Sequence, residues 1–305
     1  MKAFVLERYG KKRALRAAEM PVPALRDDEV LIEVHAAGVN LLDAKIRDGE
    51  FKLVLPYRPP LVLGHDVAGV VVKAGPQVRQ FKPGDEVYAR PDDFRIGTFA
   101  EFVPVKEASL ALKPKSLTME EAASVPLVAL TAWQALVERA KLKKGQKVFI
   151  QAGSGGVGTI AIQLAKHLGA TVATTTSAAN VALVKSLGAD VVIDYKTQDF
   201  EDVLRDYDVV LNSQDGKTLE KSMRVLKRGG KLISISGPPE PEVMPRIFLA
   251  FSARNAFTWF CEEVNMSVLY LRFHASTFSA SPFGPSSMKG GAPSMAITLH
   301  LCSAR

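Results

Sequence analysis

A glycine pattern in the middle of the chain constrains the fold more than any other feature. An apolar run, Val148–Gln151, leads into glycines at positions 153, 155 and 158, and a helical pattern follows as far as Leu168. A strand, a tight turn and a helix in this order are typical of a dinucleotide-binding unit. A glycine turn that only connects two elements is the alternative. The flanking pattern favours a nucleotide whose phosphates meet the helix N-terminus.

The glycines of this loop have different expected tasks. Gly153 permits the tight turn, Gly155 lets the backbone approach a pyrophosphate, and Gly158 lets the helix pack closely on the strand. We therefore expect the whole loop to bind the cofactor, through Gly153, Ser154, Gly155, Gly156, Val157 and Gly158.

The residues that follow the second strand of this unit favour NADPH over NADH. An NAD site usually has an acidic residue about 20 positions after the first glycine. Here the strand Thr171–Ser177 ends in hydroxyls, and the next acidic residue is Asp190. Thr175, Thr176 and Ser177 can donate hydrogen bonds to a 2′-phosphate, which a carboxylate would repel. A threonine-rich strand without a ligand is the alternative, because Thr favours strands.

Two patterns divide the chain. Up to about residue 122, short strands alternate with Pro and Gly turns, which suggests a small β-barrel. From Lys147, strands alternate with helices, which predicts a doubly wound parallel sheet with its ligand beyond the carboxyl ends of the strands. The expected barrel strands are Lys2–Leu6, Glu29–Ala37, Asp66–Ala74, Glu86–Ala89 and Thr98–Val103. Two helical segments are expected between the two patterns, at Glu120–Ala123 and Val128–Ala140. The expected strands of the parallel sheet are Val148–Gln151, Thr171–Thr175, Val191–Asp194, Val209–Asn212 and Lys231–Ser236. The expected helices between them are Val157–Leu168, Ala179–Leu187, Phe200–Arg205 and Lys217–Val225.

These patterns predict three segments. A barrel domain is expected over residues 1–122 and a nucleotide domain over residues 123–250. Residues 251–305 have no Asp, and Ser, Pro, Gly and Met accumulate over Ser276–Met295. We expect this last segment to be altered, truncated, frameshifted or disordered.

Composition excludes several other classes of protein. The net charge of +7 is spread along the chain, and its most basic run, Lys11–Arg13, favours a solvated turn over a nucleic-acid patch. Ser124–Val137 is too short to span a bilayer, and Met1–Leu6 does not begin a secretion signal, so a cytoplasmic protein is expected. No Cys precedes Cys261, which excludes a cysteine nucleophile or a thiolate zinc site before that residue.

Several stretches match a known family pattern as a set. They are His35–Asp43, Pro60–Val71, Phe81–Val87, Gly97–Glu101, Leu130–Trp133, the glycine loop, Tyr207–Gly216 and Gly229–Gly237. This set resembles the zinc-free quinone oxidoreductase and alkenal reductase branch of the medium-chain dehydrogenase/reductases, from Met1 to about Pro245. The resemblance implies an α/β protein with a GroES-like β-barrel substrate domain, a Rossmann domain and commonly a homodimer.

The resemblance also suggests roles for single residues. Asn40 and Thr131 resemble positions near the nicotinamide, and Ser177 and Tyr195 resemble positions near the 2′-phosphate. Simpler interpretations are a turn cap for Asn40, a hydroxyl bonded to its own helix for Thr131 and a rim aromatic for Tyr195. Three residues at the ends of later strands complete the expected cofactor site, namely Asn212, Ser236 and Gly237.

The zinc ligands of the family's metal-containing members are not all present. Those members have a Cys where this chain has Asn40, and a His-Glu pair where it has His65 and Asp66. A catalytic zinc needs three protein ligands, and the thiolate is missing. We expect no metal, and a packed or hydrogen-bonded His65.

The expected reaction is hydride transfer from NADPH to a quinone or an α,β-unsaturated carbonyl (an enone). Without zinc, the developing oxyanion needs a hydrogen-bond donor, and Asn40 and Lys45 are the candidate catalytic residues. Lys45 could also be an ordinary exposed lysine of a helix. A zinc-dependent alcohol dehydrogenase and a non-catalytic NADPH-binding or nucleic-acid-binding protein are the alternatives, although no nucleic-acid partner is expected.

Overall fold

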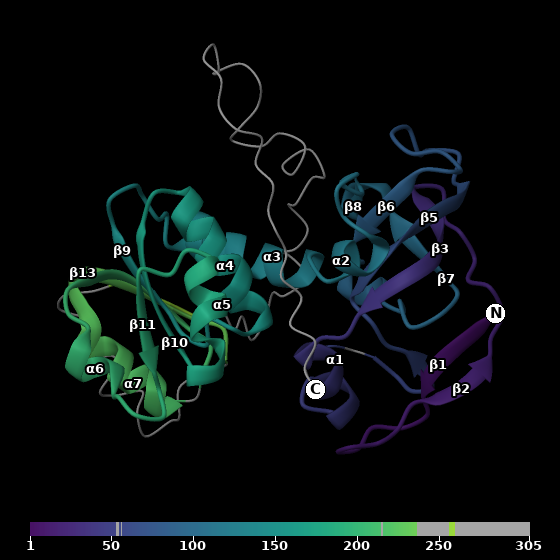
Figure 1. Cartoon of the computed structure of the whole chain (residues 1–305). Helices are drawn as coiled ribbons and strands as arrows, with labels where there is room; N and C mark the ends of the chain where they lie inside the picture. Colours follow the sequence, from purple (N-terminus) through teal and green to yellow (C-terminus); the bar gives the residue numbers. More distant parts are fainter. Residues whose placement is uncertain (53–54, 56, 215, 237–255, 260–305) are drawn as a thin grey trace, which may run out of the picture. The chain divides into compact units, whose positions relative to one another are not determined.

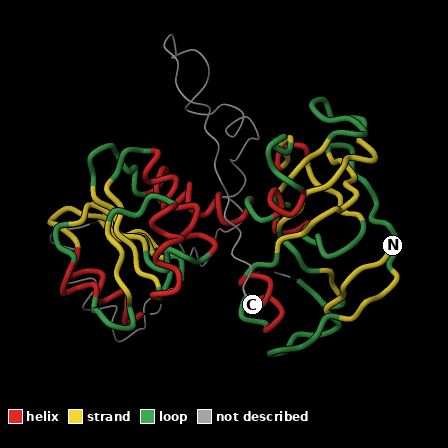
Figure 2. Tube along the Cα trace, viewed as in Figure 1, coloured by secondary structure: helices red, strands yellow, loops and turns green. Residues whose placement is uncertain are grey.

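The computed structural model describes residues 1–52, 55, 57–214, 216–236 and 256–259. These residues divide into two compact units, one ending at Leu127 and one beginning at Val128. Each unit is built around its own sheets (Figures 1 and 2). The GroES-like and Rossmann architecture predicted from the sequence is confirmed, and each unit is described separately below.

Antiparallel strands build the first unit. Its strands are β1 (Lys2–Leu6), β2 (Arg16–Glu19), β3 (Glu29–Gly38), β4 (Leu61–Val62), β5 (Asp66–Ala74), β6 (Glu86–Ala89), β7 (Phe102–Lys106) and β8 (Leu110–Leu112), and its helices are α1 (Leu41–Asp48) and α2 (Met119–Ala123). One sheet has the order β7-β3-β5-β6-β8 and the other the order β2-β1-β4. In the larger sheet, β3 pairs with β5 from Val30↔Ala74 to Gly38↔Asp66. This register places the end of β3, two residues before Asn40, beside the start of β5.

The sequence predicted one strand of this unit in the wrong place. A strand was expected at Thr98–Val103, but β7 begins at Phe102, where it pairs with Glu33 of β3. The residues before it bond to other segments instead: Phe99 N–H donates to the carbonyl of Leu63 at 3.0 Å. The short strand β2 was not predicted, because three of its four residues are exposed and give no alternating apolar pattern.

The second unit is a parallel sheet in the order β11-β10-β9-β12-β13-β14. Its strands are β9 (Lys147–Ile150), β10 (Thr171–Thr176), β11 (Val191–Asp194), β12 (Tyr207–Asn212), β13 (Leu226–Ser234) and β14 (Ala256–Trp259). Its helices are α4 (Gly156–His167), α5 (Val181–Ser186), α6 (Phe200–Val203) and α7 (Gly216–Val225), preceded by α3 (Pro126–Trp133), which begins in the first unit. Of the C-terminal segment predicted to be atypical, the structure describes β14 and the rest lies outside the described residues.

Alternation along β9 explains why helices cover both faces of this sheet. Val148 and Ile150 pack in one apolar cluster with Ile162 of α4. Phe149 faces the opposite way and packs with Phe200 of α6, their ring centroids 4.8 Å apart. Because successive side chains of a strand point to opposite faces, a continuous apolar strand is buried on both sides. This arrangement leaves the carboxyl ends of the strands for the loops that carry the predicted cofactor residues.

Some boundaries in the second unit differ from the sequence prediction. The helix expected over Val128–Ala140 begins at Pro126, and its second part, Gln134–Arg139, is π-helical. The helix expected over Ala179–Leu187 is a 3₁₀ turn, Ala178–Asn180, followed by α5. Hydrophobic periodicity does not distinguish these helix types here, because segments of three and six residues are too short for their different numbers of residues per turn to show.

Candidate functional site

The glycine loop between β9 and α4 is held in one conformation by close packing. Ala152 has φ = +50°, and its N–H donates to Thr175 Oγ1 at 3.1 Å. A Cβ atom on Gly153 would lie 2.1 Å from Thr174 Oγ1, and one on Gly158 would lie 2.2 Å from the carbonyl oxygen of Ala152. Neither position can therefore hold a side chain without moving the loop or the neighbouring strand.

Two other glycines leave the backbone of the loop accessible. Gly155 and Gly156 are exposed, and a Cβ on either would come no closer than 3.2 Å to its nearest neighbour. Gly155 is also the N-cap of α4, so the cap residue has no side chain that could accept from the first N–H groups of this helix. The exposed backbone and the positive end of the helix dipole can bind an anion such as a pyrophosphate.

Three threonines at the end of β10 support the loop. Thr174 Oγ1 donates to the carbonyl of Ile150 at 2.6 Å, and Thr176 Oγ1 donates to Ser154 Oγ at 2.9 Å. With Thr175, they are buried. The sequence predicted that Thr175 and Thr176 donate directly to a 2′-phosphate. In the structure both hydroxyls contact the glycine loop and position it: Thr176 donates its proton to Ser154, whereas Thr175 accepts from the N–H of Ala152 and keeps its own proton.

A polar rim remains open beside the loop. Asn180 Nδ2 donates to Ser154 Oγ at 3.4 Å and to Ser177 Oγ at 3.5 Å. Ser154 Oγ therefore accepts two hydrogen bonds, which leaves its own proton for another acceptor. Tyr195 is 61% exposed. The register also places Asp194 beside Thr176, and Asp194 Oδ1 accepts from the N–H of Lys196 at 3.0 Å.

The residues predicted at the last strand ends differ in accessibility. Asn212 is fully buried, and its Nδ2 donates to Ser234 Oγ at 3.1 Å and to Ser236 Oγ at 3.2 Å. Asn212 therefore ties the ends of β12 and β13 together, and its amide N–H groups already have partners within the chain. Its expected contact with the cofactor stays a prediction. Ser236 is exposed, and Gly237 lies outside the described residues.

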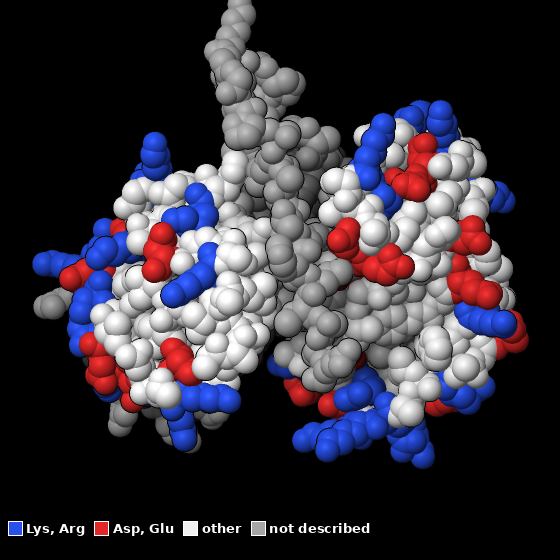
Figure 3. Space-filling view, viewed as in Figure 1, with Lys and Arg blue, Asp and Glu red and all other residues white. Residues whose placement is uncertain are grey.

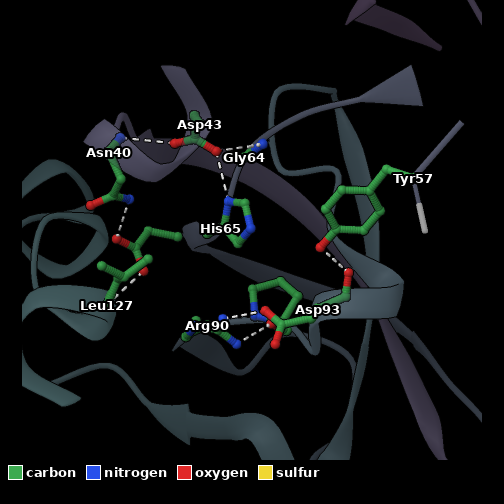
Figure 4. A network of polar contacts seen from close by, with 10 residues as sticks. Asn40, Asp43, Tyr57, Gly64, His65, Arg90, Asp93 and Leu127 are labelled. Atoms are coloured by element: carbon green, nitrogen blue, oxygen red, sulfur yellow. Dashed lines mark hydrogen bonds and ion pairs between the residues drawn. The ribbon is translucent and has the colours of Figure 1, made fainter. Parts of the chain in front are cut away.

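The first unit contains a buried polar network that starts at Asn40 (Figure 4). Asn40 is the N-cap of α1 and is half-buried, and its backbone N–H donates to Asp43 Oδ2 at 2.8 Å. Its Nδ2 donates to Asp66 Oδ2 at 2.9 Å. The other oxygen of Asp66, Oδ1, accepts from the backbone N–H of Leu127 in the first turn of α3, also at 2.9 Å. One carboxylate thus joins the starts of two helices.

His65 lies in the same network and is hydrogen-bonded, as predicted. Its Nδ1 is 2.7 Å from Asp43 Oδ1, and the ring is fully buried. In the described part of the chain, Nε2 has no hydrogen-bond partner, and no three His, Cys, Asp or Glu side chains are grouped as metal ligands. Burial raises the pKa of Asp66 to about 7, opposed by the hydrogen bonds from Asn40 and Leu127.

The other two residues predicted near the reacting groups lie outside this network. Lys45 is on α1, and its Nζ is 3.7 Å from Glu50 Oε2 in an ion pair. Thr131 is half-buried on α3, four residues after Leu127. Two apolar residues that flank Asn40 are unusually open: Val39 is 82% exposed and Leu41 is 74% exposed.

Sequence reasoning did not identify the residues that hold the candidate site residues in place. Asp43 had a signal, because an acidic residue three positions after an Asn at a helix start is typical of an N-terminal cap. Asp66 is 26 residues from Asn40, and no local spacing relates them. The β3–β5 register brings them together.

Two family models match the chain: the alcohol dehydrogenase GroES-like domain over residues 26–115 and the zinc-binding dehydrogenase over residues 156–268. The structure of a quinone oxidoreductase from Coxiella burnetii is similar, with a TM-score of 0.76 and 33% identity, over 89% of this chain and 86% of that one. The chain belongs to the medium-chain dehydrogenase/reductases. Within this superfamily it belongs to the quinone oxidoreductase and alkenal reductase branch, as the sequence motifs suggested.

Two other members of the superfamily have names that mention a cofactor. The NADPH-dependent alkenal/one oxidoreductase of Arabidopsis thaliana chloroplasts is 42% identical over 250 residues, which are 79% of this chain and 64% of that protein. This chain thus spans less than two thirds of that relative's length. A mycobacterial protein solved in complex with NADPH has a TM-score of 0.79 at 31% identity, over 92% of this chain and 86% of that one.

Replacing single glycines should separate the packing role from the binding role in this dehydrogenase/reductase loop. Gly153→Ala places a methyl group on Thr174, and we expect a loss of about 1–3 kcal/mol in the free energy of unfolding, typical of overpacking. Gly155→Ala has room, and we expect a change within about 0.5 kcal/mol. Chemical denaturation of both variants checks this, and equal losses would contradict it.

The buried carboxyl of Asp66 should give the stability a characteristic pH dependence. Its folded-state pKa is about 7, above the value of roughly 4 in an unfolded chain. Its stabilising contribution is therefore complete below about pH 4 and is lost as the pH rises towards about 7. Between pH 5 and 8 the melting temperature of the Asp66→Asn variant should fall less than that of the wild type. The exposed Asp27→Asn is the matched control and should follow the wild type.

Proposed function

We propose that the chain is an NADPH-dependent oxidoreductase that transfers hydride to a quinone or an enone. The observation that carries this proposal is the exposed backbone of Gly155 and Gly156 at the start of α4, beside a rim of neutral donors. The names of the relatives in this branch support both acceptor classes.

The second unit fits a reduced dinucleotide phosphate. The N–H groups around Gly155 and Gly156 would bind the pyrophosphate. The free proton of Ser154, with Ser177 and Asn180, would bind the 2′-phosphate, and Thr175 and Thr176 would hold the loop in place. Bound NADPH would supply the hydride, and the protein would orient it and exclude side reactions.

We infer that the reaction does not use zinc. Asn40 offers an amide where the zinc-containing members of the family have a thiolate ligand. Of the other candidate ligands, His65 keeps Nε2 without a partner among the described residues, but both oxygens of Asp66 are committed, one to Asn40 and one to Leu127. These contacts also weigh against the alternative of a zinc-dependent alcohol dehydrogenase.

Asn40 is the better of the two candidate reactive residues. It is half-buried, and its neighbours in the sequence, Val39 and Leu41, are exposed and offer apolar surface that suits a quinone or enone. Lys45 is paired with Glu50, so its ammonium already has a counter-ion. We therefore propose a ligand contact for Asn40 and none for Lys45.

Charge and hydropathy give no support to a nucleic-acid or membrane-spanning function. On the face shown in Figure 3, basic and acidic side chains are interspersed over both units, without a continuous basic stripe. Among the described residues, no helix is long and apolar enough to cross a membrane. A homodimer remains a proposal supported by the family resemblance. A cytoplasmic location also remains a proposal, and the similar proteins include chloroplastic and mitochondrial ones.

Steady-state kinetics should show turnover of quinones or enones with NADPH, at least about tenfold more efficient than with NADH. The reason is that several hydrogen bonds to the charged 2′-phosphate, each worth about 1.5–3 kcal/mol, are made only with NADPH. Treatment with a chelator is the control and should leave the rate unchanged. Equal use of NADH would contradict the proposed rim. Loss of activity after chelation, together with stoichiometric zinc in the untreated protein, would favour an alcohol dehydrogenase. Binding of NADPH without turnover would favour a non-catalytic protein.

A further inference from the structure

Asp66 uses both of its carboxylate oxygens as acceptors from different elements. Oδ2 accepts from the side-chain amide of Asn40 and Oδ1 from the backbone N–H of Leu127, each at 2.9 Å. The side chain is only 1% exposed, so water does not compete for these positions. Of the two donors, the Leu127 N–H is fixed in the first turn of α3, whereas the Asn40 amide can rotate.

This difference determines which end of the Asn40 amide can face Asp66. When Asp66 is ionised it can only accept, so it holds Nδ2 of Asn40 towards itself. The oxygen Oδ1 is then turned to the other side, as Figure 4 shows for the two ends of the amide. If the residue at position 66 had only one acceptor oxygen, that oxygen would stay bonded to the fixed N–H of Leu127. The side-chain amide of Asn40 would then turn over, so that its oxygen faced position 66.

We propose that Asp66 is a positioning residue that makes Asn40 present its amide oxygen, an acceptor, to the bound cofactor. The proposal rests on the proposed NADPH-dependent function. A ligand of the Asn40 amide oxygen must carry an N–H or O–H donor. A reduced dinucleotide carries both, in its carboxamide and in its ribose hydroxyls. An amide oxygen cannot stabilise an oxyanion. The geometry therefore assigns Asn40 to cofactor binding and not to the oxyanion stabilisation expected from the sequence.

A double-mutant cycle tests whether Asp66 acts through Asn40. NADPH affinity is measured from nicotinamide fluorescence, with no acceptor present, in the wild type, Asn40→Ala, Asp66→Asn and the double variant Asn40→Ala/Asp66→Asn. We expect each single substitution to raise the Kd about tenfold, which is about 1.4 kcal/mol of binding free energy, because a hydrogen bond to the ligand is lost. On the Asn40→Ala background, Asp66→Asn should have no further effect. A purely structural role would instead weaken binding equally on both backgrounds.

Exchanging the two residues provides a second test at constant charge. In Asn40→Asp/Asp66→Asn, the new amide at position 66 can donate to the new carboxylate at position 40, which again presents an oxygen to the ligand. We expect this variant to bind NADPH more tightly than Asn40→Ala. If Asp66→Asn alone does not fold, this comparison decides the question.

The proposal is overturned if Asp66→Asn leaves the Kd unchanged, if its effect persists on the Asn40→Ala background, or if the exchanged pair binds no better than Asn40→Ala. Failure of the proposed function gives a different result. A wild type that binds NADPH but reduces no quinone or enone contradicts the function, while the cycle still reports on Asp66. A wild type that does not bind NADPH contradicts both.

Discussion

The close contact between the glycine loop and β10 is the constraint on which the proposed cofactor site depends. Gly153 passes so near Thr174 that a Cβ would lie 2.1 Å from its hydroxyl oxygen. The same hydroxyl donates to the carbonyl of Ile150, so the strand before the loop and the strand beside it are joined at this point. The loop then turns sharply enough to leave Gly155 and Gly156 exposed at the start of α4. We infer that this contact helps to keep the helix N-terminus available to a phosphate.

In the first unit, hydrogen bonds to a buried carboxyl group, and not close packing, fix the candidate site residue. Asp66 is buried and would be costly to ionise alone, yet it accepts one hydrogen bond from each of two helix starts. Asn40 is thereby held with a defined orientation between two exposed apolar residues. In each unit, one group holds in place another group that we propose contacts the ligand: Thr174 holds the glycine loop, and Asp66 holds Asn40.

The sequence was sufficient for the architecture because its signals are local. Alternation of strands and helices after Lys147 predicted the parallel sheet, and Val191–Asp194 matches β11 at both ends. Asp66–Ala74 and Glu86–Ala89 likewise match β5 and β6. The residues of the glycine loop could be predicted because strand, turn and helix follow one another directly.

The sequence could not show which polar residues remain available to a ligand, because that depends on contacts between distant segments. Thr176 ends a strand and looks like an open donor, but its hydroxyl is bonded to Ser154, 22 positions away. Asn212 is occupied in the same way by Ser234. Asn180, predicted only to start a helix with a favourable dipole, proves to be part of the open rim.

The central claim, that a reduced dinucleotide phosphate binds at this glycine loop, is tested most directly by amide hydrogen exchange with and without NADPH. The account predicts slower exchange for Gly153–Gly158 and for Ser177–Asn180 when NADPH is bound. With NADH it predicts protection of the first segment and less of the second. Unchanged exchange in Gly153–Gly158 at saturating NADPH would contradict it.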